Sequence, residues 1–208
     1  MGWYRWWSSR LYCPKYIIQC IYDKETSQYS LLDWWVFSYI FWGMRDNFWN
    51  SQQNIILIGF MGTGKSTIGR NLSQIFGYPL IDTDHIIVEQ QGRPIPEIFA
   101  TEGENAFRDI ETKLLRSLHK YSGHIIATGG GIIGREENRN ILRELGYVVW
   151  LIAKPSEILE RTSRNSNRPL LNNDDPEGTI RDLLEIRTPL YSKTAHLGIE
   201  TDDLSFIF

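Results

Sequence analysis

Residues 59–67 read Gly59-Phe60-Met61-Gly62-Thr63-Gly64-Lys65-Ser66-Thr67, which matches the pattern G-x-x-x-x-G-K-[ST]. The run before this match, 54–58, is largely apolar and β-branched, which is typical of a fully buried strand. After the match, apolar residues recur at helical spacing, and Gly77 is suited to end that helix. The recurring residues are Ile68, Leu72, Ile75 and Phe76. A strand, a glycine-rich loop and a helix in this order predict a phosphate-binding loop.

The chemistry of such a loop is local. Glycines let consecutive backbone N–H groups turn toward one anion, and the helix N-terminus adds the positive end of its dipole. Lys65 can reach the β- and γ-phosphates of a nucleotide, and the hydroxyl of Ser66 is placed to bind Mg²⁺. The candidate nucleotide-binding residues in the loop are Gly62, Thr63, Gly64, Lys65, Ser66 and Thr67. The alternative is a glycine-rich turn with a surface lysine, but strand, motif and helix all agree on the phosphate loop.

The composition is that of an ordinary globular protein, with 42% hydrophobic and 23% charged residues. The net charge of −3 does not indicate nucleic acid or a membrane surface as the main partner. The two cysteines, Cys13 and Cys20, are too few for a disulfide scaffold and fit a reducing compartment. We therefore expect a cytoplasmic protein with no nucleic-acid partner, and we expect it to be a monomer.

The first 52 residues differ from the rest of the chain, because seven of the eight tryptophans lie there. No helical or strand period organises them. One interpretation is an anchor at a membrane interface, a layer that Trp and Tyr favour. The other is an aromatic-rich, poorly ordered extension that is no part of the fold. We favour the second, and expect no membrane association of residues 1–52, because the most apolar piece is too short to span a bilayer.

From residue 53 onward, segments with strand character alternate with segments of helical period. This alternation predicts an α/β domain whose parallel sheet is covered on both faces. The domain is expected to span 53–203, with a short tail at 204–208. Strands are expected at 54–58, 78–82, 125–128, 148–152 and 197–200. Helices are expected at 68–76, 84–89, 94–99, 107–118, 135–145, 155–162 and 176–191, with a capping box at Thr101–Glu104, a C-cap at Gly146 and a mobile loop at 164–175.

Asp82 and Asp84 follow the second predicted strand, at the edge of a doubly wound sheet where ligands bind. Asp82 can hold Mg²⁺ through its water shell, since Mg²⁺ keeps several waters. Asp84 can accept a hydrogen bond from a substrate hydroxyl and act as a general base. The alternative is a helix N-cap with a solvated neighbour, but the adjacent phosphate loop favours the functional interpretation.

Two further sites carry candidate substrate contacts. Arg108 and Glu111 are spaced i, i+3 on one helical face, and form either a surface ion pair or an arginine fixed by Glu111 and aimed at a carboxylate. The run Gly129-Gly130-Gly131 allows close backbone approach to a ligand, or makes a tight strand-to-loop turn. Arg168 in the mobile loop is interpreted as a lid arginine that meets phosphate on closure. The four histidines show no spacing that suggests a ligand set.

The order of these motifs resembles the shikimate kinase family over about residues 54–200. The motifs are the phosphate loop, Asp82-x-Asp84, Phe107-Arg108-x-x-Glu111, Gly129-Gly130-Gly131, Arg168-Pro169-Leu170-Leu171 and Arg187-x-Pro189-Leu190-Tyr191. The resemblance implies a P-loop NTPase fold, similar to nucleoside-monophosphate kinases, with a five-stranded parallel sheet in the order 2-3-1-4-5. It also implies phosphorylation of the 3-hydroxyl of shikimate by MgATP, on the route to chorismate and the aromatic amino acids.

The same resemblance implies roles for single residues. On the nucleotide side, Lys65 and Ser66 would handle phosphate and Mg²⁺, and Asp82 would support the metal. Arg161 would stack on adenine, and Arg168 would close over the phosphates. On the acceptor side, hydroxyls of shikimate would meet Asp84 and the glycine run, through the Gly130 backbone, while its carboxylate would be held by Arg108 and Arg187. The catalytic candidates are therefore Lys65, Asp84 and Arg168.

Two features depart from the family pattern. The family chain continues after its last strand into an adenine-side loop and a C-terminal helix, whereas this sequence ends at Phe208. We therefore expect uncovered core surface and weaker ATP binding. The aromatic N-terminal stretch has no counterpart either. Two alternatives remain: a gluconate-type small-molecule kinase on the same fold, and a nucleotide-binding protein with impaired catalysis. The two arginines and the Asp-x-Asp pair favour shikimate.

Overall fold

The computed structural model describes residues 53–163 and 175–202. Three predictions lie outside the described residues. They concern the extension 1–52, the tail 204–208 and the loop that carries Arg168.

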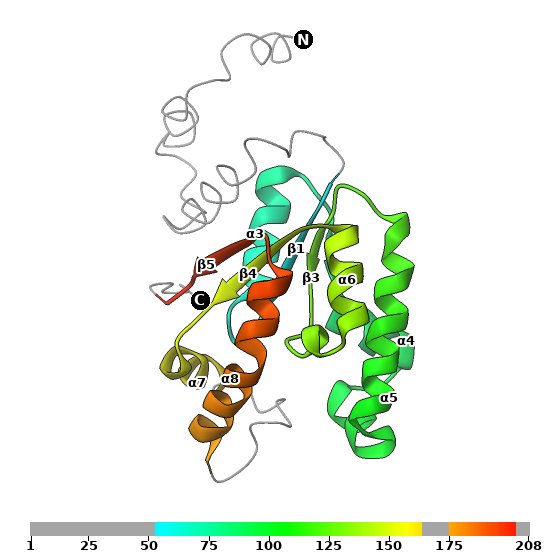
Figure 1. Ribbon diagram of the computed structural model, residues 1–208. Coiled ribbons are helices and arrows are strands. Elements are labelled where there is room, and N and C mark those ends of the chain that lie inside the picture. Colours follow the sequence, from blue (N-terminus) through cyan, green and yellow to red (C-terminus); the bar gives the residue numbers. More distant parts are fainter. Residues whose placement is uncertain (1–52, 164–174, 203–208) are drawn as a thin grey trace, which may run out of the picture.

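At the centre of the molecule lies a five-stranded sheet in the order β2-β3-β1-β4-β5 (Figure 1). Every neighbouring pair of strands is parallel. The strands are β1 Asn54–Gly59, β2 Leu80–Asp82, β3 Ile125–Ala127, β4 Gly146–Ile152 and β5 Leu197–Glu200. The predicted fold class and strand order are therefore confirmed. This order puts β1 in the middle of the sheet, so the loop that follows it emerges at the centre of the carboxyl edge.

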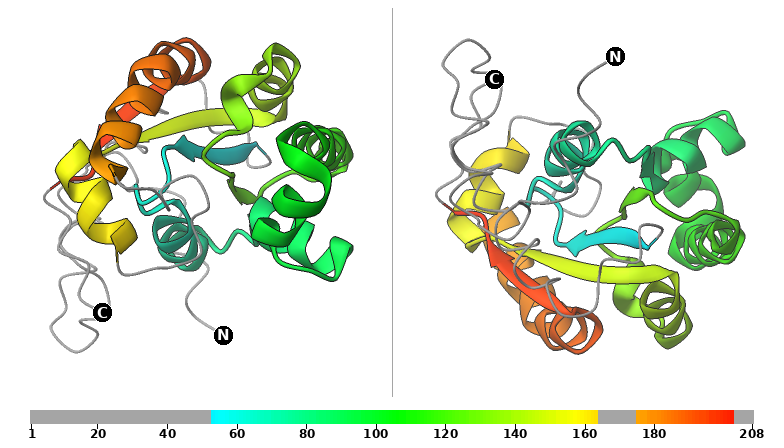
Figure 2. Two further views of the ribbon diagram at one scale, coloured as in Figure 1. Left: turned by 90° about the horizontal axis from the view of Figure 1, so that it is seen from below. Right: turned by 90° about the horizontal axis from the view of Figure 1, so that it is seen from above.

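The helices cover both faces of this sheet. They are α3 Lys65–Phe76, α4 Thr83–Gln91, α5 Ile95–Ser117, α6 Glu136–Leu145, α7 Pro155–Ser163 and α8 Pro176–Thr194, with 3₁₀ turns at Leu118–Lys120 and Ile132–Gly134. In Figure 2, α3 lies on one face of the sheet, and α6 and α8 lie on the other. Among the helices of the described ranges, none is both long enough and apolar enough to cross a membrane.

The alternation of side chains along β1 explains the two faces. Ile55 and Leu57 are fully buried in a cluster with residues of α3. Ile56 and Ile58 point the other way, into a larger cluster with residues of α5, α6 and α8. Successive side chains of a strand point to opposite faces, so a strand covered on both sides must be apolar throughout. The continuous apolar run before the glycine loop follows from this position.

The break expected between the helices 94–99 and 107–118 is present inside α5 as a kink at Gly103, whose backbone is not helical (φ 82°, ψ 171°). The capping box predicted at Thr101–Glu104 is wrong. The Thr101 hydroxyl instead donates to the carbonyl of Glu97, one turn back (2.8 Å). A threonine inside a helix can bond its own preceding turn in this way, so its presence alone did not mark an N-terminus.

Candidate functional site

The phosphate-binding loop occupies the centre of the carboxyl edge of the sheet. Figure 2 (left) shows this edge from below, with α7 and α8 on one side and α4 and α5 on the other. Gly62 and Gly64 have φ angles of +79° and +88°, a region that side chains with a Cβ rarely adopt. Gly64 is the N-cap residue of α3 and has no side chain that could fill the space in front of the helix. The N–H groups at the start of α3 and the helix dipole therefore suit the binding of an anion.

Lys65 is held within this loop. Its side chain is only 8% exposed, and Nζ donates to the carbonyls of Gly59 (2.9 Å) and Phe60 (2.8 Å). The positive charge is therefore fixed beside the backbone groups that would surround phosphate. This position suits the neutralisation of charge on a transferred phosphoryl group.

Ser66 and Asp82 come together at the start of α3 and the end of β2. The Ser66 hydroxyl donates to Asp82 Oδ2 at 2.6 Å. The other oxygen, Oδ1, accepts from the backbone N–H groups of Asp84 and His85 and caps α4. Asp82 is thus both an N-cap and the partner of Ser66. One hydroxyl and one carboxylate fit Mg²⁺, which takes oxygen ligands and keeps several waters.

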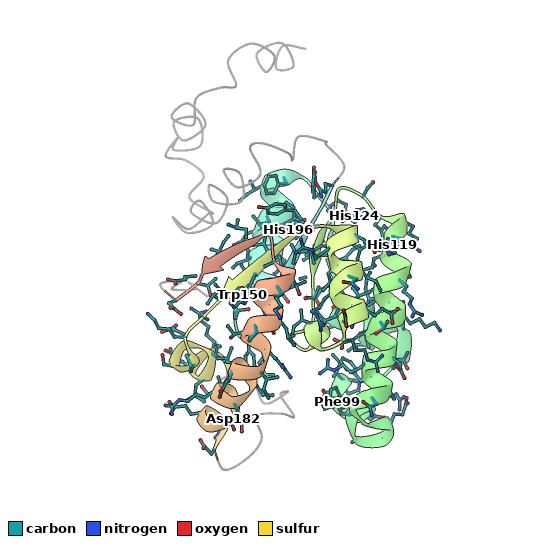
Figure 3. The ribbon with its side chains drawn as sticks, viewed as in Figure 1. Phe99, His119, His124, Trp150, Asp182 and His196 are labelled. Carbon is teal, nitrogen blue, oxygen red and sulfur yellow. The ribbon has the colours of Figure 1, made fainter. Side chains whose placement is uncertain are left out.

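A larger protein ligand set is absent from the part of the chain that the structure describes. No group of three or more His, Cys, Asp or Glu residues there is arranged to hold a metal ion. His119, His124 and His196 lie at the opposite edge of the sheet from the phosphate loop (Figure 3). Any Mg²⁺ at Ser66 and Asp82 would therefore depend on water and on phosphate oxygens for its other ligands.

Arg108 is half-buried and held by two carboxylates. Nη1 donates to Glu111 Oε2 at 2.5 Å, and Nη2 donates to Glu104 Oε1 at 2.8 Å. The Arg108 side chain is 12% exposed and that of Glu111 only 1%. This burial does not fit a loose surface pair, which would be solvated and weak. It fits a guanidinium whose plane is fixed before a ligand arrives.

The glycine turn after β3 lies directly against this pair. A methyl group built on Gly129 would lie 2.7 Å from Asp84 Oδ1 and 2.8 Å from Glu111 Oε1. One built on Gly131 would collide with the guanidinium of Arg108. Larger residues would therefore displace the charged side chains. The predicted candidates Asp84, Arg108 and the glycine turn thus lie together in one site, on three different elements.

Arg187 reaches the same region from α8. Its guanidinium lies over the ring of Phe60 in the phosphate loop, with 5.5 Å from Cζ to the ring centroid. Its charge is close enough to the buried acid to lower the pKa of Glu111. Arg187 is therefore at the boundary between the phosphate loop and the site of Arg108.

Arg161 lies on α7, across the phosphate loop from α4 and α5. Its Nη2 donates to the carbonyl of Thr201 at 2.8 Å and to Glu157 Oε2 at 3.2 Å. The guanidinium therefore links α7 to the segment that follows β5. Its predicted role in stacking on adenine stays a prediction. The predicted partner across the phosphates, Arg168, lies outside the described residues.

Two residues of the site received no role from the sequence. Thr83 accepts a hydrogen bond from Gly129 N (3.1 Å) and so ties the glycine turn to α4. The Tyr191 hydroxyl donates to the carbonyl of Gly130. Tyr191 is the last residue of the Arg-x-Pro-Leu-Tyr motif, and membership of this motif could have marked it as a site residue. A threonine after an aspartate carries no comparable signal.

Glu111 has an unusual electrostatic environment. Burial raises the pKa of its carboxyl to about 7, although Arg108 acts in the opposite direction, and the charge of Asp84 adds to the rise. Its Oε1 is buried without a hydrogen-bond partner among the described residues. The carboxylate form is therefore less stable in the folded protein than in the unfolded chain.

This environment predicts a pH-dependent stability. The folded-state pKa of Glu111 is raised from 4.5 to about 7. Its contribution to the free energy of unfolding is therefore complete below pH 4.5 and is lost as the pH rises through 7. Over this window the free energy of unfolding should fall by up to about 3 kcal/mol more in the wild type than in Glu111→Gln. Urea denaturation at several pH values measures the difference. The control is Glu104→Gln, at the exposed partner of Arg108, which should keep the wild-type slope. Parallel curves for wild type and Glu111→Gln would contradict this account.

Taken together, the fold and the site define a P-loop kinase that phosphorylates a small molecule. The nucleotide side is a phosphate loop with a lysine and a Ser–Asp pair. Beside it lie two arginines and an aspartate, which are the candidates for binding the acceptor. The shikimate kinase family model matches residues 61–206, and the chain belongs to this family.

Individual relatives agree with this assignment. A shikimate kinase from Marinomonas sp. (strain MWYL1) is 51% identical over 151 residues, which are 72% of this chain and 83% of the relative. A solved structure of shikimate kinase from Acinetobacter baumannii in complex with shikimate is 45% identical, with a TM-score of 0.72 over 74% of this chain and 86% of that chain. The crystal structure of shikimate kinase from Bacteroides thetaiotaomicron is 29% identical, with a TM-score of 0.70 over 75% of this chain and 90% of that chain.

Proposed function

We propose that this protein transfers the γ-phosphoryl group of ATP to the 3-hydroxyl of shikimate and so forms shikimate 3-phosphate. The observation that carries the proposal is the acceptor site beside the phosphate loop. There a half-buried Arg108, fixed by Glu111, faces the glycine turn, and Arg187 approaches from α8. Membership of the shikimate kinase family and a relative solved with shikimate support it.

On the nucleotide side, the N–H groups of the loop and Lys65 bind the phosphates. Ser66 and Asp82 would hold Mg²⁺, which supplies charge neutralisation to the phosphates when it is bound. Arg161 stacks on the adenine, and Arg168 closes over the phosphates. Phosphoryl transfer needs little covalent help from the protein, so these residues act by position and by charge.

On the acceptor side, Arg108 and Arg187 bind the carboxylate of shikimate. Glu111 keeps the plane of Arg108 fixed, so little side-chain freedom is lost when the ligand binds. The glycine turn lets the backbone of Gly130 approach a hydroxyl. Asp84 accepts a hydrogen bond from the attacking hydroxyl and takes its proton as the phosphoryl group arrives.

The test compares acceptors at saturating MgATP, with the full-length protein. Shikimate should give a kcat/KM at least about a hundredfold above that of gluconate, because the two arginines and Asp84 match a ring carboxylate with adjacent hydroxyls. Higher turnover with gluconate would support the gluconate-type alternative. ATP binding without turnover of either acceptor would support a nucleotide-binding protein with impaired catalysis.

A further inference from the structure

Tyr191 is fully buried, and its hydroxyl interacts with the Gly130 carbonyl and with the side chain of Arg187. It lies on α8 four residues after Arg187, so the two side chains share a face of the helix. The hydroxyl donates to the carbonyl of Gly130, which is 61 residues away in the sequence. A buried hydroxyl needs such a partner, and burial raises the pKa of Tyr191, so the group stays protonated as a donor.

The ring of Tyr191 has little room to move. It stacks on Trp150 of β4, with 5.7 Å between the ring centroids and 17° between the ring planes. Figure 3 shows Trp150 in the sheet beside α8. Because the indole belongs to β4, an inner strand, the sheet limits the movement of the Tyr191 ring.

Gly130 in turn is packed against the phosphate loop. A methyl group built on it would lie 3.0 Å from the backbone nitrogen of Met61 and 3.4 Å from the carbonyl oxygen of Gly59. Methyl groups built on its neighbours Gly129 and Gly131 would meet the side chains of Asp84, Glu111 and Arg108. The peptide that Tyr191 holds therefore touches the nucleotide side and the acceptor side together.

We propose that Tyr191 is a positioning residue: its hydroxyl fixes the glycine turn to α8, so that Arg187, the turn and the phosphate loop keep one relative geometry. The inference rests on the proposed function for its kinetic consequence. Tyr191 acts through the carbonyl of Gly130 and through the side chain of Arg187.

The variant Tyr191→Phe removes the hydroxyl and keeps the ring on Trp150. Its kcat/KM for shikimate should fall about tenfold, the equivalent of one hydrogen bond, while the KM for ATP changes less than about twofold. In an Arg187→Ala background, Tyr191→Phe should lower kcat/KM for shikimate by less than about threefold, because the two residues act as one unit.

The control is Thr194→Val, three residues further along α8. Thr194 is also buried and donates its hydroxyl to a backbone carbonyl, that of Leu190 (2.7 Å). This variant should lose stability similar to that lost by Tyr191→Phe, with unchanged kinetics. A purely structural role of Tyr191 would make the two variants alike, and that result would overturn the proposal.

Amide hydrogen exchange tests the anchoring without any substrate. The Gly129 and Ile132 amides, which bond to Thr83 and to the Gly129 carbonyl, should exchange about tenfold faster in Tyr191→Phe than in Thr194→Val. Unchanged exchange would overturn the proposal. So would faster exchange with wild-type shikimate kinetics. If the wild-type protein does not turn over shikimate, the proposed function is refuted. The exchange result would still decide whether Tyr191 anchors the glycine turn.

Discussion

Replacing Lys65 by alanine should lower kcat with ATP and shikimate by at least about a thousandfold, as expected for loss of a preorganised charge on the transferred group. The side chain is buried in the loop, and its ammonium group is held by the carbonyls of Gly59 and Phe60. No other described lysine lies in the phosphate loop. The measurement is steady-state kinetics at saturating shikimate with MgATP varied.

The same substitution removes a donor from two loop carbonyls, so we expect a stability loss of about 1–3 kcal/mol with the fold retained. Circular dichroism and a denaturation curve separate this loss from the kinetic effect. The matched control is Lys113→Ala, at an exposed position of α5, which should leave kcat unchanged. Turnover near the wild-type value in Lys65→Ala would refute the role of the loop.

Replacing Arg187 by alanine should lower kcat/KM for shikimate by at least about a hundredfold, within the 2–5 kcal/mol expected for removing one partner of a charged contact. Arg187 and Arg108 come from α8 and α5 and share no local structural reason to be arginine. Both charges act on the buried carboxyl of Glu111, whereas Glu104, the second carboxylate bonded to Arg108, is exposed. A carboxylate ligand would bind to the two guanidinium groups together. Nucleotide affinity should change little.

The measurement varies shikimate at fixed MgATP and titrates ATP separately without shikimate. Arg181→Ala is the matched control, because Arg181 lies on the same helix, is 66% exposed and pairs with Glu177. Arg187→Lys should recover part of the loss, since it restores the charge without the planar fork. An equal loss of ATP binding, or unchanged shikimate kinetics, would place Arg187 outside the acceptor site.

The sequence was sufficient to predict the fold where a local pattern determines the structure. The glycine loop needs a strand before it and a helix after it, and both are visible as apolar periods. The strand order came from the resemblance to a family, because periodicity alone does not say which strands are neighbours. The carboxyl edge then followed, since parallel strands place the ends of β1, β2 and β3 side by side.

The sequence was insufficient where a contact joins distant segments. Tyr191 and the Gly130 carbonyl are far apart in the chain, and no local pattern joins them. Asn54 appeared to be part of an apolar strand, yet its buried amide donates to the carbonyls of Tyr121 and Leu145. The burial of Glu111 is a third case. A spacing of i, i+3 is the same in a solvated pair and in a buried one, so the high pKa of this acid required the fold.

The most direct test of the central claim is the identity of the product. Full-length protein is incubated with MgATP and shikimate, ADP release is followed, and the phosphorylated product is assigned by NMR. We predict one ADP for each shikimate 3-phosphate, with no ADP formed above background when shikimate is omitted. ADP release that does not depend on shikimate, or phosphate found on a different hydroxyl, would contradict the account.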